Sequence, residues 1–169
     1  MSQLLDMLGS KYPIIQGPIG SINSPELVAA ISDAGGYGML ALGFMNDIEE
    51  VKRLLEEVKK RTDKTFGANI MIINPLNEKI IPLLAESGMK TVTTSVGFPG
   101  RIYPLLHEHG MKGLHVLLSV KHAISAEQAG ADGIVAAGAE AGGLRSTGPE
   151  SSTMRSEEHT SELQSLRHL

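Results

Sequence analysis

A glycine-rich loop after a short apolar run is the part of this sequence best suited to chemistry. Gly133 to Ala137 lacks helical periodicity, as expected for a parallel strand that is buried on both faces. Gly138, Gly142 and Gly143 follow it, and glycines leave backbone amides open to a phosphate or a planar ring. Such a loop alone is often only a tight turn. Ligands bind at the carboxyl ends of parallel strands, however, so we interpret this loop as part of a binding site.

Strand and helix patterns alternate along the whole sequence that precedes this loop. Helix starts are indicated by Ser24-Pro25 and by Asp47, and helix ends by glycines such as Gly88 and Gly110. The predicted strands are 12–16, 37–42, 65–73, 91–95, 113–118 and 133–137, and the predicted connecting helices are 24–33, 47–58, 76–86, 102–108 and 120–128.

This alternation predicts an α/β fold, a truncated (β/α)₈ TIM barrel of about six parallel strands with an open edge. The complete barrel needs about 250 residues, and this chain has 169. No linker or second domain is indicated. We expect residues 1–154 to form the N-terminal part of one barrel domain.

The last fifteen residues match something other than a protein fold. Arg155 to Ser165 reads as the in-frame translation of a common sequencing-library adapter, and Leu166 to Leu169 fits the continuation of that adapter. Segments of this kind are excluded from reasoning about the fold. We therefore expect residues 155–169 to be a non-native tail and the native sequence to end near Met154.

The composition is that of an ordinary globular protein. Hydrophobic residues make up 41% and charged residues 20%, and the net charge of −4 comes without a basic stripe, which argues against a nucleic-acid partner. The chain has no cysteine, which excludes disulfides and thiol catalysis. No secretion signal and no membrane-spanning run is recognisable. The sequence thus favours a cytoplasmic enzyme that acts on a small-molecule substrate, without a metal site.

Three sequence motifs stand out together: Lys11 to Gly20 (KYPIIQGPIG), Gly67 to Ile70 (GANI) and Gly138 to Gly143 (GAEAGG). With them the chain resembles the nitronate monooxygenase family, formerly called 2-nitropropane dioxygenase, which includes flavin-dependent enoyl-acyl-carrier-protein reductases. The segment from Ser24 to Gly38 fits the same pattern. The resemblance extends in order from about Leu5 to Met154.

The resemblance implies a barrel that binds flavin mononucleotide (FMN). It implies that Gly17, Pro18 and Ile19 lie near the isoalloxazine ring and that Asn69 hydrogen-bonds the flavin. It also implies that Gly142, with Gly138 and Gly143 of the same loop, lines the phosphate side. In such enzymes the cofactor carries out the redox step and the protein positions it.

The sequence departs from the family pattern at three positions. The family usually has Met at the position of Ile19 and a polar Gln or Glu at that of Ala137. The third departure concerns catalysis, because a catalytic His normally follows the double glycine and Leu144 stands there instead. Leucine cannot accept a proton, so no residue is assigned as the general base. Arg145 could stabilise an anion, and His107, His109, His115 and His122 do not match the motif.

Three other interpretations stay open at this level. A flavin-dependent enoyl reductase would share the scaffold and use reduced nicotinamide. A phosphate-binding barrel isomerase or synthase would bind phosphate but no flavin. An inert gene fragment would have no activity, since the loops after strands seven and eight, which usually hold the phosphate in barrels, are absent here. The sequence leaves the oligomeric state and the precise substrate undetermined.

Overall fold

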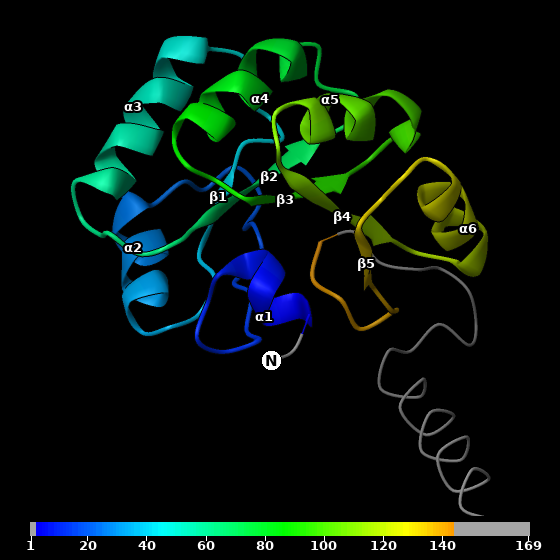
Figure 1. Cartoon of the computed structure of the whole chain (residues 1–169), viewed down its shortest axis with the longest axis horizontal. Coiled ribbons are helices and arrows are strands. Elements are labelled where there is room, and N and C mark those ends of the chain that lie inside the picture. Colours follow the sequence, from blue (N-terminus) through cyan, green and yellow to red (C-terminus); the bar gives the residue numbers. More distant parts are fainter. Residues whose placement is uncertain (1–2, 144–169) are drawn as a thin grey trace, which may run out of the picture.

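The structure is a computed structural model, and it describes residues 3–143. Leu144, Arg145 and the adapter-like tail lie outside the described residues, so the expectations for them remain untested. The described part is an α/β domain in which helices and parallel strands alternate (Figure 1).

Five parallel strands form one open sheet. They are β1 (Met39–Ala41), β2 (Gly67–Met71), β3 (Thr91–Ser95), β4 (Lys112–Leu117) and β5 (Gly133–Ala136), and their order in the sheet follows their order in the chain. Ala41 lies beside Asn69, Asn69 beside Thr93, and Thr93 beside Leu114. This register puts side chains of neighbouring strands at the same level. The predicted α/β fold with an open parallel sheet is confirmed.

Five helices lie along the convex side of the sheet, as Figure 1 shows. They are α2 (Pro25–Asp33), α3 (Ile48–Lys59), α4 (Asn77–Glu86), α5 (Ile102–Glu108, after the 3₁₀ turn η1 at Pro99–Arg101) and α6 (Val120–Gln128). Each corresponds to a predicted helix. Four of them connect successive strands, and α2 precedes β1. Ser24, Asp47 and Ser119 cap α2, α3 and α6 by accepting hydrogen bonds from backbone amides of the first turn.

The first predicted strand, 12–16, was overestimated. It forms only one parallel bridge, between Ile15 and Tyr37. Pro13 has no amide hydrogen to donate to a ladder, and the amides of Lys11 and Tyr12 both donate to the carbonyl of Gly35 instead. The segment therefore sits beside β1 in the predicted position without becoming a regular strand.

A short helix at the N-terminus was not predicted. This helix, α1 (Gln3–Leu8), lies on the concave side of the sheet, opposite the other helices (Figure 1). Met7 and Leu8 pack there with Tyr37, Met39 and Leu114. The hydroxyl of Thr91, at the start of β3, donates to the carbonyl of Met7 at 2.6 Å. The amino end of the concave face is thus closed by α1, and its carboxyl end is left for a ligand.

The larger core lies between the sheet and the outer helices. Strand residues such as Leu40, Ala68, Ile70 and Val92 pack there against apolar side chains from α2 to α5. Because side chains alternate along a strand, Ala41, Asn69 and Thr93 point to the other, concave face. The fold therefore separates an apolar outer layer from a partly polar lumen.

Candidate functional site

Three polar side chains of the lumen form a small hydrogen-bonded group on β2 and β3. The Asn69 amide nitrogen donates to the hydroxyl oxygen of Thr93 at 2.9 Å. The Ser95 hydroxyl donates to the Asn69 amide oxygen at 3.3 Å. All three residues are buried. These contacts hold the Asn69 amide in one orientation within the lumen.

The predicted site residues before α2 lie at the rim of the sheet. Gly17, Pro18 and Ile19 are exposed, and they directly follow the bridge at Ile15. An added side chain at Gly17 would meet no atom within 4 Å. The space next to this backbone is open, as a closely approaching planar ring would require.

Asn23 holds the rim segment against β1. Its amide oxygen accepts from the Ala41 amide at 2.8 Å, and its amide nitrogen donates to the Ala41 carbonyl at 3.0 Å. Gln16 adds a bond from the Met39 amide to its side-chain oxygen at 3.4 Å. The sequence analysis did not single out Asn23. Its position directly before the Ser24-Pro25 helix start was the one available signal.

The loop after β5 supplies the predicted glycines from the other end of the sheet. Gly138 is buried, whereas Gly142 and Gly143 are exposed. The amide of Ala141 donates to the carbonyl of Gly138 at 3.3 Å and closes a turn. Side chains added at Gly142 or Gly143 would meet nothing within 4 Å. This loop leaves backbone exposed where an anion can approach.

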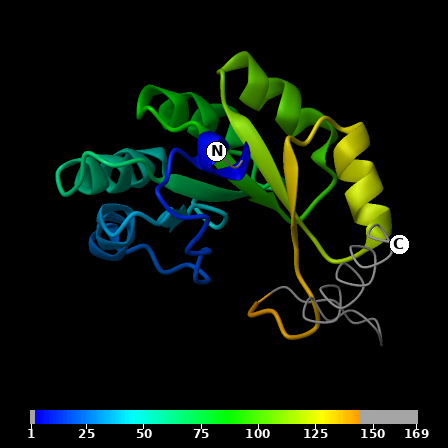
Figure 2. The same cartoon turned by 60° about the horizontal axis from the view of Figure 1, so that its bottom comes forward.

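Predicted site residues therefore come from both borders of the sheet and from β2, rather than from one compact cluster. In Figure 2 the segment before α2 and the loop after β5 extend to the same side of the strands. Asn69 lies on β2, between these two ends. The structure thus places the residues along one open face, with the bridge segment and β5 as its borders.

No cation site accompanies these residues in the described part of the chain. Residues 3–143 contain no group of three or more His, Asp or Glu side chains able to hold a metal ion. Within the same range, no helix has the length and apolar character needed to cross a bilayer.

The open parallel sheet and the outer helices define part of a (β/α) barrel. Comparison with known proteins shows which family it resembles. Residues 1–81 match the family model for nitronate monooxygenase. A probable nitronate monooxygenase of Staphylococcus aureus strain JH9 is 28% identical over 180 residues, which cover 85% of this chain and 50% of that protein. The chain is thus homologous to members of the nitronate monooxygenase family.

Solved structures agree with this assignment. FabK from Thermotoga maritima is 32% identical, with a TM-score of 0.77 over 87% of this chain and 48% of that one. A nitroalkane oxidase from Streptomyces ansochromogenes, at 23% identity, shares the fold with a TM-score of 0.71 over 85% of this chain and 51% of that one. The chain spans about half the length of the curated relatives it matches. It is homologous to part of a TIM-barrel oxidoreductase.

Proposed function

We propose that this chain is the N-terminal half of an FMN-dependent oxidoreductase that oxidises alkyl nitronates with O₂. The observation that supports the proposal is the pre-oriented amide of Asn69 between two glycine-containing rims, on a chain homologous to this family. Gly17, Pro18 and Ile19 would border the flavin ring, and Asn69 would hydrogen-bond it. Gly138, Gly142 and Gly143 would line the phosphate side.

The described residues fit the ring side of a flavin well. Glycine at position 17 leaves room for a flat group, and the exposed Ile19 side chain offers it an apolar contact. Thr93 and Ser95 hold Asn69 so that its polar atoms do not have to reorganise on binding. The bound flavin would supply the electron transfer. The chain's own residues would position it and exclude water from one of its faces.

The part of the proposed site that would hold the FMN phosphate is less complete than the part that would hold the ring. Barrels of this type commonly hold phosphate with loops after strands seven and eight and with an additional helix N-terminus. The glycines after β5 offer backbone amides but no positive charge. We therefore propose that the complete parent protein binds FMN and that residues 1–154 alone bind it weakly or not at all.

The test begins with the uninterrupted coding sequence beyond Met154. We expect the purified parent to show a visible flavin spectrum and to release FMN on denaturation, and residues 1–154 to lack both. In the parent, Asn69→Ala should weaken FMN binding roughly tenfold, the value of about one hydrogen bond to the cofactor. A colourless parent that binds inorganic phosphate would instead support a barrel isomerase or synthase.

A flavin-dependent enoyl-acyl-carrier-protein reductase is the second candidate. The similarity to FabK, at 32% identity, supports it. Two assays on the yellow parent separate the candidates. Oxygen consumption driven by an alkyl nitronate supports the first, and enoyl-thioester-dependent oxidation of reduced nicotinamide supports the second.

A further inference from the structure

A pocket of about 420 Å³ lies between the loop after β3, strand β4 and helix α6. None of its residues belongs to the proposed flavin site, and all of them lie in the described part of the chain. They are Val96, Gly97, Phe98, Pro99, His115, Val116, Leu118, His122 and Ser125. Its volume falls in the range of small-molecule sites.

A buried histidine supplies the polar floor of this pocket. His115 is 5% exposed, and its Nδ1 atom lies 2.9 Å from the Thr94 hydroxyl. Within residues 3–143, Nδ1 is the ring nitrogen that has a protein partner. Since His115 lines the pocket, its Nε2 atom is left for a ligand.

A buried tyrosine determines which nitrogen of this ring carries the proton. The Tyr103 hydroxyl lies 2.8 Å from the Thr94 hydroxyl, and burial raises the pKa of Tyr103 to about 12. The phenol therefore keeps its proton, and Thr94 is its partner among the described residues. If Tyr103 donates to Thr94, the Thr94 hydroxyl donates to Nδ1 of His115. Burial also lowers the pKa of His115, which favours the neutral ring, so its Nε2 carries the hydrogen and acts as a donor.

Helix α6 lines the pocket with polar side chains, and the loop after β3 lines it with apolar ones. His122 and Ser125 lie one turn apart on α6 and line the same pocket. The Ser125 hydroxyl donates to the Lys121 carbonyl at 3.1 Å, so the imidazole of His122, in the first turn of the helix, is the α6 group left for a ligand. Phe98 and Pro99 form an apolar wall, and the Phe98 side chain is 73% exposed. No Asp or Glu is among the lining residues. The pocket thus joins the imidazoles of His115 and His122 to an apolar surface.

We propose that this pocket binds a small amphipathic carboxylate, whose oxygens accept hydrogen bonds from His115 Nε2 and the His122 imidazole while its apolar part packs on Phe98. A metal ion fits less well, since two imidazoles are the only strong metal ligands in the lining. The proposal does not depend on flavin binding, because none of the flavin-site residues takes part.

Ligand-observed fluorine NMR on the full chain tests this proposal at low protein concentration. The probe is 4-fluorobenzoate, and the neutral 4-fluorobenzamide serves as its control. We expect millimolar binding of the benzoate. The benzamide should bind at least tenfold more weakly, because it has almost the same shape but lacks the charge.

Matched variants locate the binding. His115→Leu should reduce the affinity for the benzoate at least tenfold, whereas His109→Leu, a change at an exposed histidine outside the pocket, should leave it unchanged. Phe98→Ala keeps the test valid if His115→Leu does not fold, because the exposed Phe98 ring supports no core packing. It should weaken binding severalfold. Equal binding of both probes, or unchanged benzoate binding in Phe98→Ala, would overturn the proposal.

Discussion

At the scale of single residues, Asn69 shows what the structure adds to the sequence. The family resemblance implies that Asn69 hydrogen-bonds a flavin, and the structure adds the contacts with Thr93 and Ser95 that fix the orientation of its amide. Those contacts could not be read from the sequence, because they depend on the register between β2 and β3. His115 illustrates the converse. It matched no motif, and its importance emerges from the Thr94 and Tyr103 partners that the fold brings to it.

Position 144 carries the residue-scale prediction for catalysis. In the full-length parent, Leu144→His should raise turnover of neutral nitroalkanes, since it supplies the general base that the family pattern has there. A general base typically contributes about 10²–10⁴ in rate. Alkyl nitronates are already deprotonated, so their turnover should change much less.

The measurement is the ratio of turnover with a neutral nitroalkane to turnover with an alkyl nitronate, taken for wild type, Leu144→His and Leu144→Asn. Asparagine adds polarity without accepting a proton, so Leu144→Asn should leave the ratio near the wild-type value. The interpretation of position 144 is wrong if His and Asn change the ratio equally.

At the scale of elements, the sequence predicted all five outer helices, because each has a cap or glycine stop and an apolar stripe. Helix α1 was missed for a physical reason. A six-residue helix is unstable by itself, and this one is stabilised by packing of Met7 and Leu8 against side chains that are distant in sequence. The first strand was overestimated because its apolar composition hid the effect of Pro13 on pairing.

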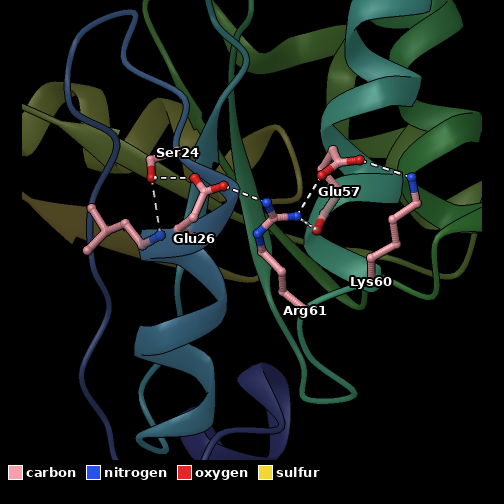
Figure 3. A network of polar contacts seen from close by, with 6 residues as sticks. Ser24, Glu26, Glu57, Lys60 and Arg61 are labelled. Atoms are coloured by element: carbon pink, nitrogen blue, oxygen red, sulfur yellow. Dashed lines mark hydrogen bonds and ion pairs between the residues drawn. The ribbon is translucent and has the colours of Figure 1, made fainter.

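The start of α2 supports a prediction about capping. The Ser24 hydroxyl accepts from the Leu27 amide at 3.2 Å and donates to Glu26 at 3.1 Å. Glu26 in turn meets Arg61, which also pairs with Glu57 of α3 (Figure 3). Ser24→Ala should lower the free energy of unfolding by about 0.5–2 kcal/mol, because an amide loses its partner.

Urea unfolding measures this loss, and Ser24→Thr is the conservative control that keeps the cap. Arg61→Gln should have a smaller effect that fades with added salt, as expected for exposed ion pairs. A Ser24→Ala protein as stable as wild type would show that the cap contributes nothing.

Close packing of α2 on β1 rests on Gly38. A methyl group there would lie 2.3 Å from the backbone oxygen of Val28, which cannot move aside without shifting the helix. Gly38→Ala should therefore destabilise the fold by about 3 kcal/mol, the upper part of the range for overpacking. Gly17→Ala is the matched control, since an added methyl group there meets nothing within 4 Å.

The two alanine variants also separate stability from binding. Gly17→Ala should unfold at the same urea concentration as wild type, yet in the parent it should weaken FMN binding by crowding the ring. If Gly38→Ala is as stable as wild type, helix α2 does not pack on β1 as described.

At the scale of the whole molecule, the open sheet is the dominant property. Among residues 3–143, β5 pairs only with β4, and the segment beside β1 makes a single bridge. Both borders carry exposed isoleucines, Ile134 on β5 at 52% and Ile14 beside β1 at 63%. Unpaired backbone next to apolar side chains is a template for pairing with another chain. A closed barrel would have no open sheet border. A chain that spans about half the length of its barrel relatives cannot close such a barrel.

The whole-molecule prediction is that this chain associates with itself, and that the β5 border is a principal contact. Ile134→Lys should reduce association, because a charged side chain on an edge strand opposes strand pairing. Ile124→Lys is the matched control. Ile124 is 51% exposed, almost the same as Ile134, but it lies on the outer face of α6, where no edge is available. Sedimentation velocity over a series of protein concentrations should show association that falls for Ile134→Lys and persists for Ile124→Lys. A monomer at every concentration would contradict the role of the open sheet, and equal effects of the two lysines would assign the association to general surface hydrophobicity rather than to the edge.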